Sequence, residues 1–429
     1  SPGADASRSP KPTKGALLIV WLVVFIDLLG FGIVLPVMPR QAGPYLDHLG
    51  LHEAARGVII GVLFSVFSLM QFVFSPMWGR VSDRIGRRPV LLISLLGSVV
   101  FYALYGVAVA LSPEHAELAL GLMLLARVGA GIAGASVGTA AAVIADCTTP
   151  ETRAKGMALI GIAFGMGFTL GPLLAYFGLA LFAREPWGVG ALASLLSLAA
   201  LLIALAVFEE TRDPNNKAGK EFFSLAKTRE VLAMPTVGVL VLVYFMAIFA
   251  FANFEATLAL LTRAAFGLGD DDNFLVFATV GGVLTVAGGM YRPLAKKGSE
   301  TRLLKVGVGL MMFGLGGIGV VALAVYNEPP VRGAEPASLK TGFYLAMSVA
   351  VVGFAFVNPS VSALVSKRSD PTRQGEVLGV NQAFASLGRI LGPFLGSVLF
   401  QAEPSRTLPY LAAVLTLVGV AALLPRVTR

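Results

Sequence analysis

The chain is poor in charged residues and in cysteine. Only 14% of its 429 residues are Asp, Glu, Lys or Arg, and 56% are hydrophobic, which excludes an ordinary soluble protein of this length. The single cysteine, Cys147, excludes an internal disulfide, and we interpret it as a small packing residue. The sequence lacks the Gly-x-x-x-x-Gly-Lys-Ser/Thr loop of ATP-using proteins, and its three histidines form no metal-ligand pattern.

Long apolar runs recur along the whole chain. Twelve of them are long enough to cross the roughly 30 Å hydrocarbon core of a bilayer as helices. The 49 glycines agree with such helices, since small residues let membrane helices approach closely. The sequence therefore predicts an all-α integral membrane protein with twelve transmembrane helices. The predicted spans are 16–38, 57–78, 90–111, 118–145, 154–182, 187–208, 235–261, 274–295, 303–326, 341–364, 377–400 and 408–424.

Lysine and arginine are distributed unevenly among the predicted loops. Loops and tails on one side of the membrane hold 24 of them, and those on the other side hold 7. Because positive residues concentrate on the cytoplasmic side, we expect both termini in the cytoplasm. The formal net charge of +8 then follows from topology, and it gives no reason to expect nucleic acid as a partner. We expect a monomer in the inner (plasma) membrane of a bacterium.

A charged interior segment divides the spans into two groups of six. Two related six-helix bundles imply a pseudo-two-fold axis along the membrane normal, and transporters built this way carry substrate between the halves, near the midplane. The predicted organisation is a disordered tail at 1–14, a first bundle at 15–208, a cytoplasmic linker at 209–234 and a second bundle at 235–425.

The fifth and eleventh spans carry the same glycine and proline pattern, 221 residues apart. A Gly-Pro pair weakens or kinks a helix locally, so we interpret these positions as hinges for rocking between two states. Simple close packing is the alternative, and the two interpretations are compatible. The positions are Gly167, Gly171 and Pro172 in the first half, and Gly388, Gly392 and Pro393 in the second.

Four ionisable residues fall inside the spans: Asp27, Arg127, Glu255 and Arg389. Each costs at least about 2.5–3.5 kcal/mol at mid-helix on insertion scales, so by default such groups line a polar cavity. Asp27 and Glu255 lie in equivalent spans of the two halves. A desolvated carboxylate that changes protonation as access alternates can couple transport to a proton gradient.

Each of these residues also has a structural interpretation. Asp27 could hydrogen-bond a neighbouring helix, Glu255 could be solvated near the outer surface, and Arg127 could tether two helices. Arg389 could bind an anionic substrate, pair with a cavity carboxylate, or extend toward the cytoplasm. The neutral polar residues expected beside them in the cavity are Gln71, Asn253, Asn358, Asn381 and Gln382.

The loop between the second and third spans is short and strongly charged. Residues 79–89 hold four arginines and one aspartate, and glycines suit its tight reversal. We expect Asp83, at this helix end, to gain charge-assisted hydrogen bonds from nearby arginines. The arginines could instead simply be solvated charges on the cytoplasmic side, without a specific function. Residues 79–92 resemble the signature loop of the major facilitator superfamily at every diagnostic position.

Three further segments resemble the drug/proton antiporter branch of that superfamily. One resembles the first helix of the tetracycline/proton antiporters, one a membrane-arginine motif, and one part of the antiporter motif, whose usual glycine pair is replaced by Ala175-Tyr176. In that order, the residues are Asp27, Gly30, Gly32 and Pro36; Arg127, Gly131, Gly134 and Ala135; and Gly167, Gly171 and Pro172.

The resemblance implies the major facilitator fold and a secondary active transporter, not an enzyme. It implies export of a small apolar or amphipathic, tetracycline-like compound in exchange for protons, with the proton gradient and no cofactor as energy source. It also implies that Asp83, Arg87 and Asp146 brace the outward-facing state at a cytoplasmic gate. The gate residues are Gly79, Asp83, Arg84, Gly86, Arg87, Arg88, Asp146 and Arg153.

Other functions stay open on the sequence alone. One alternative is a proton-coupled importer or an organic-anion carrier of the same fold, and Arg127 and Arg389 would favour an anion as its substrate. A non-transporting scaffold or receptor would leave the buried ionisable groups without a purpose. An intramembrane hydrolase would need Asp27 and Glu255 to approach closely, which helices on opposite halves of a cavity do not readily allow.

Overall fold

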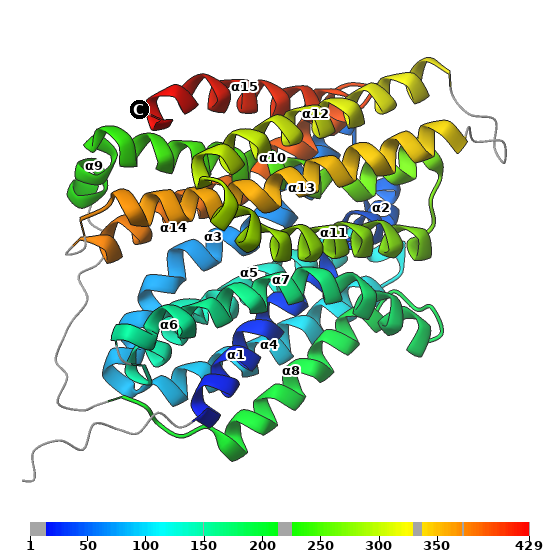
Figure 1. Ribbon diagram of the computed structural model, residues 1–429. Helices are drawn as coiled ribbons and strands as arrows, with labels where there is room; N and C mark the ends of the chain where they lie inside the picture. Colours follow the sequence, from blue (N-terminus) through cyan, green and yellow to red (C-terminus); the bar gives the residue numbers. More distant parts are fainter. Residues whose placement is uncertain (1–13, 149, 213–224, 329–336, 371–372, 429) are drawn as a thin grey trace, which may run out of the picture.

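The computed structural model describes residues 14–148, 150–212, 225–328, 337–370 and 373–428, and every regular element in these ranges is helical (Figure 1). The first part of the chain forms α1 Lys14–Val34, α2 Met38–His48, α3 Glu53–Ile85, α4 Arg87–Ala110, η1 Pro113–His115, α5 Ala116–Ala133, η2 Gly134–Ser136, α6 Val137–Asp146, α7 Pro150–Leu181 and α8 Gly188–Val207. The second part forms α9 Leu225–Ala233, α10 Pro235–Phe266, α11 Asp270–Lys297, α12 Glu300–Asn327, α13 Ala337–Arg368, α14 Gln374–Ala402 and α15 Leu408–Thr428.

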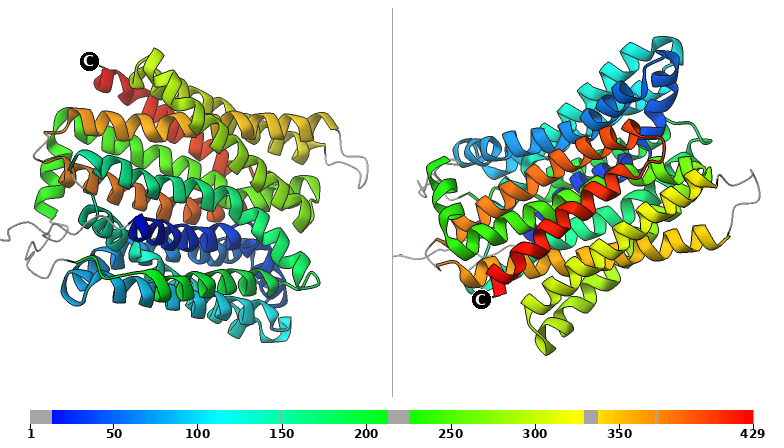
Figure 2. Two further views of the ribbon diagram at one scale, coloured as in Figure 1. Left: turned by 60° about the horizontal axis from the view of Figure 1, so that its bottom comes forward. Right: turned by 90° about the horizontal axis from the view of Figure 1, so that it is seen from above.

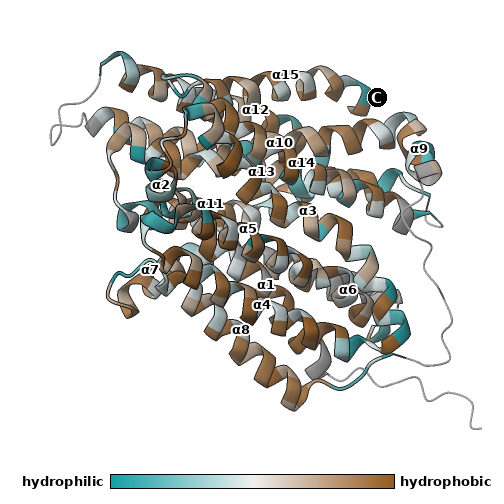
Figure 3. Cartoon of the chain, turned by 180° about the vertical axis from the view of Figure 1, so that it is seen from behind, coloured by the Kyte–Doolittle hydropathy of each residue, from teal (hydrophilic) through white to brown (hydrophobic). Residues whose placement is uncertain are grey.

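The predicted all-α membrane architecture is confirmed. Eleven helical stretches in the described residues are long and apolar enough to cross a membrane, with α5, η2 and α6 counting as one stretch. The remaining predicted span is the 32-residue helix α7, in which the stretch Thr169–Leu181 is also apolar. Figure 3 shows hydrophobic residues along the helices and hydrophilic residues gathered toward the helix ends, the pattern that a bilayer requires.

Two predicted elements differ from the structure. The first span was expected to reach Met38, but α1 ends at Val34, because Pro36 disfavours helical backbone in the residue before it. A separate helix, α2, then begins at Met38 in a segment predicted as loop. Residues 1–13 of the predicted tail and 213–224 of the predicted linker lie outside the described residues, and the rest of the linker contains α9.

The span predicted at 118–145 is interrupted by the 3₁₀ turn η2. A 3₁₀ segment changes the helical hydrogen-bonding pattern, and inside a membrane every carbonyl oxygen needs a donor. Three side chains of neighbouring helices supply donors there. Trp78 Nε1 donates to Ile132 O (2.7 Å), Ser94 Oγ to Ala133 O (2.6 Å) and Gln71 Nε2 to Gly134 O (3.0 Å).

The helices before α9 pack into one half and those from α10 onward into another (Figures 1 and 2). The two halves meet along α3 with α14 and along α7 with α11. We call the end of the bundle where α1 begins and α15 ends the terminal face, and the end that carries α2 the opposite face. Sequence analysis predicts that the terminal face is cytoplasmic.

Contacts between the halves gather toward the opposite face. Asn273 Nδ2 donates to Pro36 O (2.8 Å), and Arg40 donates to Leu268 O (3.0 Å) and Gly269 O (2.7 Å). Arg184 also forms an ion pair with Asp271. The structure is therefore in a conformation closed at the opposite face.

Candidate functional site

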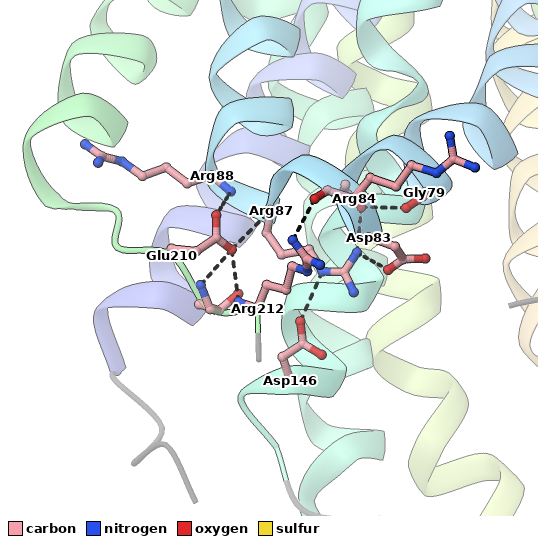
Figure 4. Close-up of polar contacts among 10 residues, drawn as sticks. Gly79, Asp83, Arg84, Arg87, Arg88, Asp146, Glu210 and Arg212 are labelled. Carbon is pink, nitrogen blue, oxygen red and sulfur yellow. Dashed lines mark hydrogen bonds and ion pairs between the residues drawn. The ribbon is translucent and has the colours of Figure 1, made fainter. Parts of the chain in front are cut away.

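The structure brings three of the predicted gate residues together at the terminal face (Figure 4). Arg87, at the start of α4, is only 8% exposed and lies between two carboxylates. Its Nη1 is 2.5 Å from Asp83 Oδ1, one turn back along the chain, and its Nε is 3.1 Å from Asp146 Oδ2 at the end of α6. The same guanidinium donates to Ser82 Oγ (2.6 Å). The cluster thus ties α3, α4 and α6 together within one half, and its function as a gate stays a prediction.

A third acidic residue, Glu210, completes this site, and sequence reasoning missed it. It follows α8, and its carboxylate accepts the backbone N–H groups of Arg87 (2.9 Å) and Arg88 (3.1 Å) at the start of α4. It also accepts the N–H groups of Thr211 (3.0 Å) and Arg212 (2.9 Å). Burial opposes its ionisation, but the four donors prevail and hold the pKa of Glu210 below its usual value. Because 123 residues separate Glu210 from Arg87, no local sequence pattern could have predicted this contact.

The remaining gate residues surround this cluster. Arg212 Nη1 donates to Arg84 O (2.7 Å), and Arg88 Nη2 donates to Leu205 O (2.9 Å). Gly86 has φ +110°, which favours glycine at the turn between α3 and α4. Gly79 O accepts a hydrogen bond from Ser82 Oγ (2.7 Å). The side chain of Arg153 lies outside the described residues.

The two arginines inside the spans have different surroundings. Arg127 of α5 is 2% exposed, donates from Nε to Leu63 O (3.1 Å) and stacks over the Phe67 ring at 4.6 Å. Both contacts are with α3, so they join α5 to α3 within the first half. The predicted role of Arg127 in the transport cavity stays a prediction. Arg389 of α14 is partly exposed, and its Nη2 donates to Ser386 Oγ (3.1 Å), one turn away on the same helix.

Arg389 also has neighbours on α10. It interacts electrostatically with Glu255 and with Tyr244, although no carboxylate of the described residues lies within 4.0 Å of its guanidinium. The Tyr244 hydroxyl donates to Asn358 Oδ1 of α13 (2.6 Å). The structure therefore brings Asn358 of the predicted cavity set together with Tyr244, which sequence reasoning did not select, whereas Arg389 and Glu255 are within electrostatic range of each other without a described hydrogen bond or ion pair between them. The side chain of Asp27 lies outside the described residues, so its relation to this group is not described.

The other predicted cavity residues lie elsewhere. Asn253 is fully buried and donates to Pro409 O (3.3 Å), which joins α10 to α15. Gln71 supports the η2 turn, and Asn381 is almost fully buried in α14. Gln382, the next residue, is exposed. Asn253 and Gln71 thus hold neighbouring helices together. Substrate contact by any of these residues stays a prediction.

The predicted hinge glycines mark close helix contacts. A Cβ on Gly171 would lie 2.5 Å from the carbonyl carbon of Gly32, and one on Gly392 would lie 2.7 Å from Phe249 O. Pro172 and Pro393 lie inside the continuous helices α7 and α14. Both pairs therefore serve close packing, of α1 with α7 and of α10 with α14, while bending there stays a prediction. The two further positions, Gly167 and Gly388, make similarly close contacts.

Comparisons with known proteins agree along the whole chain. Residues 20–334 and 310–429 match the family model described as Major Facilitator Superfamily. Major facilitator superfamily domain-containing protein 10 of Bos taurus is 27% identical, over 92% of this chain and 91% of that protein. Tetracycline resistance protein, class E, of Escherichia coli is 28% identical, over 90% of this chain and 88% of that protein. The crystal structure of the human organic anion transporter MFSD10 (TETRAN) superposes with a TM-score of 0.67 and 23% identity, over 96% of this chain and 99% of that one.

Proposed function

We propose that this chain, which belongs to the Major Facilitator Superfamily, is a proton-coupled antiporter. In this proposal it exports a small apolar or amphipathic compound. The chain is a multi-span membrane transporter that acts on a small molecule. Its relatives are transporters and resistance proteins rather than enzymes. The proposal adds the coupling ion and the direction of transport.

The observation that carries the proposal is Glu255, a carboxylate of the spanning helix α10 within electrostatic range of Arg389 but without an ion pair to it in the described residues. A carboxylate inside a membrane is costly unless it serves a function, and one without a tight ion pair can bind and release a proton. The proton gradient then supplies the energy, without a cofactor. Asp27, at the equivalent position of the first half, is proposed as the second proton site. The tetracycline resistance relatives support export, since they are named for resistance to a drug.

Alternating access is the proposed mechanism. The halves are held together near the opposite face by the contacts of Asn273, Arg40 and Arg184, so the substrate is proposed to enter from the terminal face in this conformation. Rocking about the α3–α14 and α7–α11 contacts would then expose the same site to the other side. We further propose a monomer, with both termini in the cytoplasm of a bacterial cell.

The proposal is tested in proteoliposomes that contain the purified protein and a panel of amphipathic drugs, tetracycline among them. A proton gradient should drive drug accumulation by the wild type. Asp27→Asn and Glu255→Gln should each impair it, because an amide keeps the size but cannot carry the charge. Glu117→Gln, an exposed position at the start of α5, is the matched control and should behave as wild type. Full gradient-driven transport by the double variant Asp27→Asn/Glu255→Gln would overturn the coupling assignment.

A second candidate, an organic-anion carrier, is favoured by the partly exposed cation Arg389 and by the structural similarity to a human organic anion transporter. Substrate-induced pH changes inside the vesicles separate the two coupling modes, since symport and antiport move protons in opposite directions relative to the substrate. If no compound of a broad panel were transported, the alternative of a scaffold or receptor would prevail.

A further inference from the structure

Two side-chain hydroxyls form hydrogen bonds between the two halves, within the spanning helices. Ser65 Oγ of α3 donates to Ile390 O of α14 (2.7 Å). Thr169 Oγ1 of α7 donates to Gly281 O of α11 (3.1 Å) and lies 3.0 Å from Thr285 Oγ1, one turn further along α11. Hydrogen bonds of this kind join membrane helices where no water competes for the donor. Each is therefore a specific point of attachment between the halves.

The two attachments lie at the same depth in the bundle. Ser65 follows the first residue of α3 by 12 positions, and Gly281 follows the first residue of α11 by 11. Thr169 and Ile390 each precede the last residue of their helix, α7 or α14, by 12 positions. At 1.5 Å per residue, all four residues are roughly 17–18 Å from the helix ends at the opposite face. The attachments are thus deep within the membrane-spanning part of the helices.

The internal repeat accounts for this common depth. Thr169 and Ile390 are 221 residues apart, which is the offset between the repeated glycine and proline positions of α7 and α14. Each half therefore attaches to the other at the same position of the repeat. The two attachments belong to separate helix pairs, α3 with α14 and α7 with α11 (Figures 1 and 2). Two such points at one depth define a line through the molecule that is parallel to the membrane plane.

Between this line and the opposite face, α3 and α14 stay in close contact. A Cβ on Gly61 would lie 3.0 Å from Phe394 O, and one on Gly57 would lie 2.9 Å from Ser397 O. These glycines are one and two turns from Ser65 along α3. The Ser65 hydrogen bond is therefore the innermost of three contacts that begin near the opposite face.

The α7–α11 pair shows the same arrangement. The Tyr176 and Phe274 rings meet edge-to-face with their centroids 6.2 Å apart, and Arg184 forms its ion pair with Asp271 near the outer ends of the two helices. The Thr169 hydrogen bond is again the innermost of these contacts. Both helix pairs are thus joined from the opposite face inward as far as the same depth.

Distance from the line decides how far a contact moves when the halves rotate. The outer end of α7 is about 18 Å from the line, so a rotation of about 15° would displace it by roughly 5 Å. An ion pair at that end would break. On the line itself the displacement is close to zero, and a hydroxyl can turn about its C–O bond to keep a hydrogen bond while the helices tilt. Thr169 also has two oxygen partners one turn apart on α11.

We propose that Ser65 and Thr169 form the pivot of the transporter: the halves rotate about the line through their two hydrogen bonds. These bonds persist in both conformations, while the contacts nearer the opposite face separate. This inference rests on the proposed alternating access and assigns residues to its axis. Gly281 permits the close approach at the pivot, because a Cβ there would lie 2.6 Å from Thr169 Cα.

The test places a covalent link at the pivot and compares it with the same link at the outer end of the same two helices. In a Cys147→Ser background, a short, reducible bis-thiol reagent joins either Thr169→Cys with Thr285→Cys or Arg184→Cys with Asp271→Cys. Proton-driven transport of tetracycline and the amphipathic drug panel is then measured in proteoliposomes. The pivot-linked protein should keep about half or more of its transport rate, whereas the outer-linked protein should lose about 90% or more. Reduction of the link should restore the outer-linked protein.

Loss of transport in the pivot-linked protein that is restored by reduction would overturn the proposal. Full transport by the outer-linked protein would overturn it as well, because the outer ends must separate. If the pivot pair is inactive before it is linked, the second pivot pair, Ser65→Cys with Ile390→Cys, takes its place.

A second measurement tests the pivot without relying on transport. The rate of cross-linking is measured for the pivot pair and the outer pair with and without Asn273→Ala, which removes a hydrogen bond that closes the opposite face. The outer pair should link more slowly in Asn273→Ala, and the pivot pair should link at an unchanged rate. An equal effect on both pairs, or no effect on either, would overturn the pivot. If the unlinked protein transports no drug but the two pairs respond differently, proton antiport is wrong and the pivot stands.

Discussion

The carboxylate of Glu210 accepts a hydrogen bond from the backbone N–H of Arg87 at 2.9 Å, although 123 residues separate them. The contact places an anion at the N-terminus of α4, where unpaired N–H groups and the helix dipole favour negative charge. It also joins the segment after α8 to the turn between α3 and α4, where Arg87 forms ion pairs with Asp83 and Asp146. The junction between the two halves and the charged cluster are thus one connected unit.

Replacement of Glu210 by glutamine should lower the free energy of unfolding by about 1 kcal/mol near neutral pH, because the helix loses its anionic cap. Since folding lowers the pKa of Glu210, its contribution is present above the ordinary value of 4.5 and is lost as the pH falls through the folded-state pKa. The apparent unfolding temperatures of wild type and variant should converge as the pH is lowered from about 7 to about 3.5. Glu209→Gln, an exposed neighbour, is the control and should not change stability at either pH. A difference that grows on acidification would contradict the assignment.

Asp83→Asn should slow turnover several-fold while substrate affinity changes by less than about 2-fold. The substitution weakens a partly buried ion pair with Arg87, and that pair stabilises one conformer without touching substrate. Transport rates in proteoliposomes and equilibrium binding in detergent measure the two effects separately. Asp47→Asn is the matched control, because its pair with Arg56 joins a carboxylate that is 65% exposed and contributes little. Loss of substrate binding in Asp83→Asn would be incompatible with a gate.

Gly171→Ala should destabilise the protein by about 1–3 kcal/mol, because the new Cβ would meet the Gly32 backbone, which cannot move aside cheaply. Gly309→Ala is the control: nothing lies within 4 Å of its Cβ position, so alanine should be neutral or stabilising there. Thermal unfolding of both variants gives the comparison. Unchanged stability with reduced turnover in Gly171→Ala would instead favour the hinge interpretation over close packing.

Asn273→Ala should shift the protein away from the conformation closed at the opposite face. The side chain donates to Pro36 O (2.8 Å) across the two halves and accepts from Thr262 Oγ1 (3.1 Å), and losing a buried hydrogen bond costs about 1–2 kcal/mol. That corresponds to roughly a 5–30-fold change in population.

The measurement for Asn273 uses cross-linking by a short bis-thiol reagent between cysteines introduced in place of Arg184 and Asp271, whose side-chain tips form an ion pair in this conformation and whose backbones are farther apart than a direct disulfide spans. The single native cysteine, Cys147, is first replaced by serine. Cross-linking should be slower with Asn273→Ala and unchanged with Asn327→Ala, an exposed asparagine at the end of α12. Equal rates in all three backgrounds would show that Asn273 does not hold the halves together.

Much of the fold was predictable from the sequence, because length and hydropathy alone decide whether a helix can cross a bilayer. The all-α architecture, the spans and the proximity of Asp83 to Arg87 follow from such local patterns, since residues four apart on a helix are neighbours. The end of α1 near Pro36 is also a local effect. Apolar residues continue past Pro36 to Met38, so hydropathy alone predicts a longer first span than the structure has.

The tertiary structure alone decided which polar groups meet. Arg127 and Arg389 look alike as single arginines in apolar helices, yet Arg127 contacts α3, whereas Arg389 is partly exposed and hydrogen-bonds Ser386 of its own helix. The anchoring of Glu210, the support of η2 by Trp78 and the closure by Asn273 also join distant segments. A hydropathy pattern fixes that a segment lies in the membrane, but the partner of a buried polar group depends on how helices are arranged around it. That arrangement is set by the packing of all the helices together.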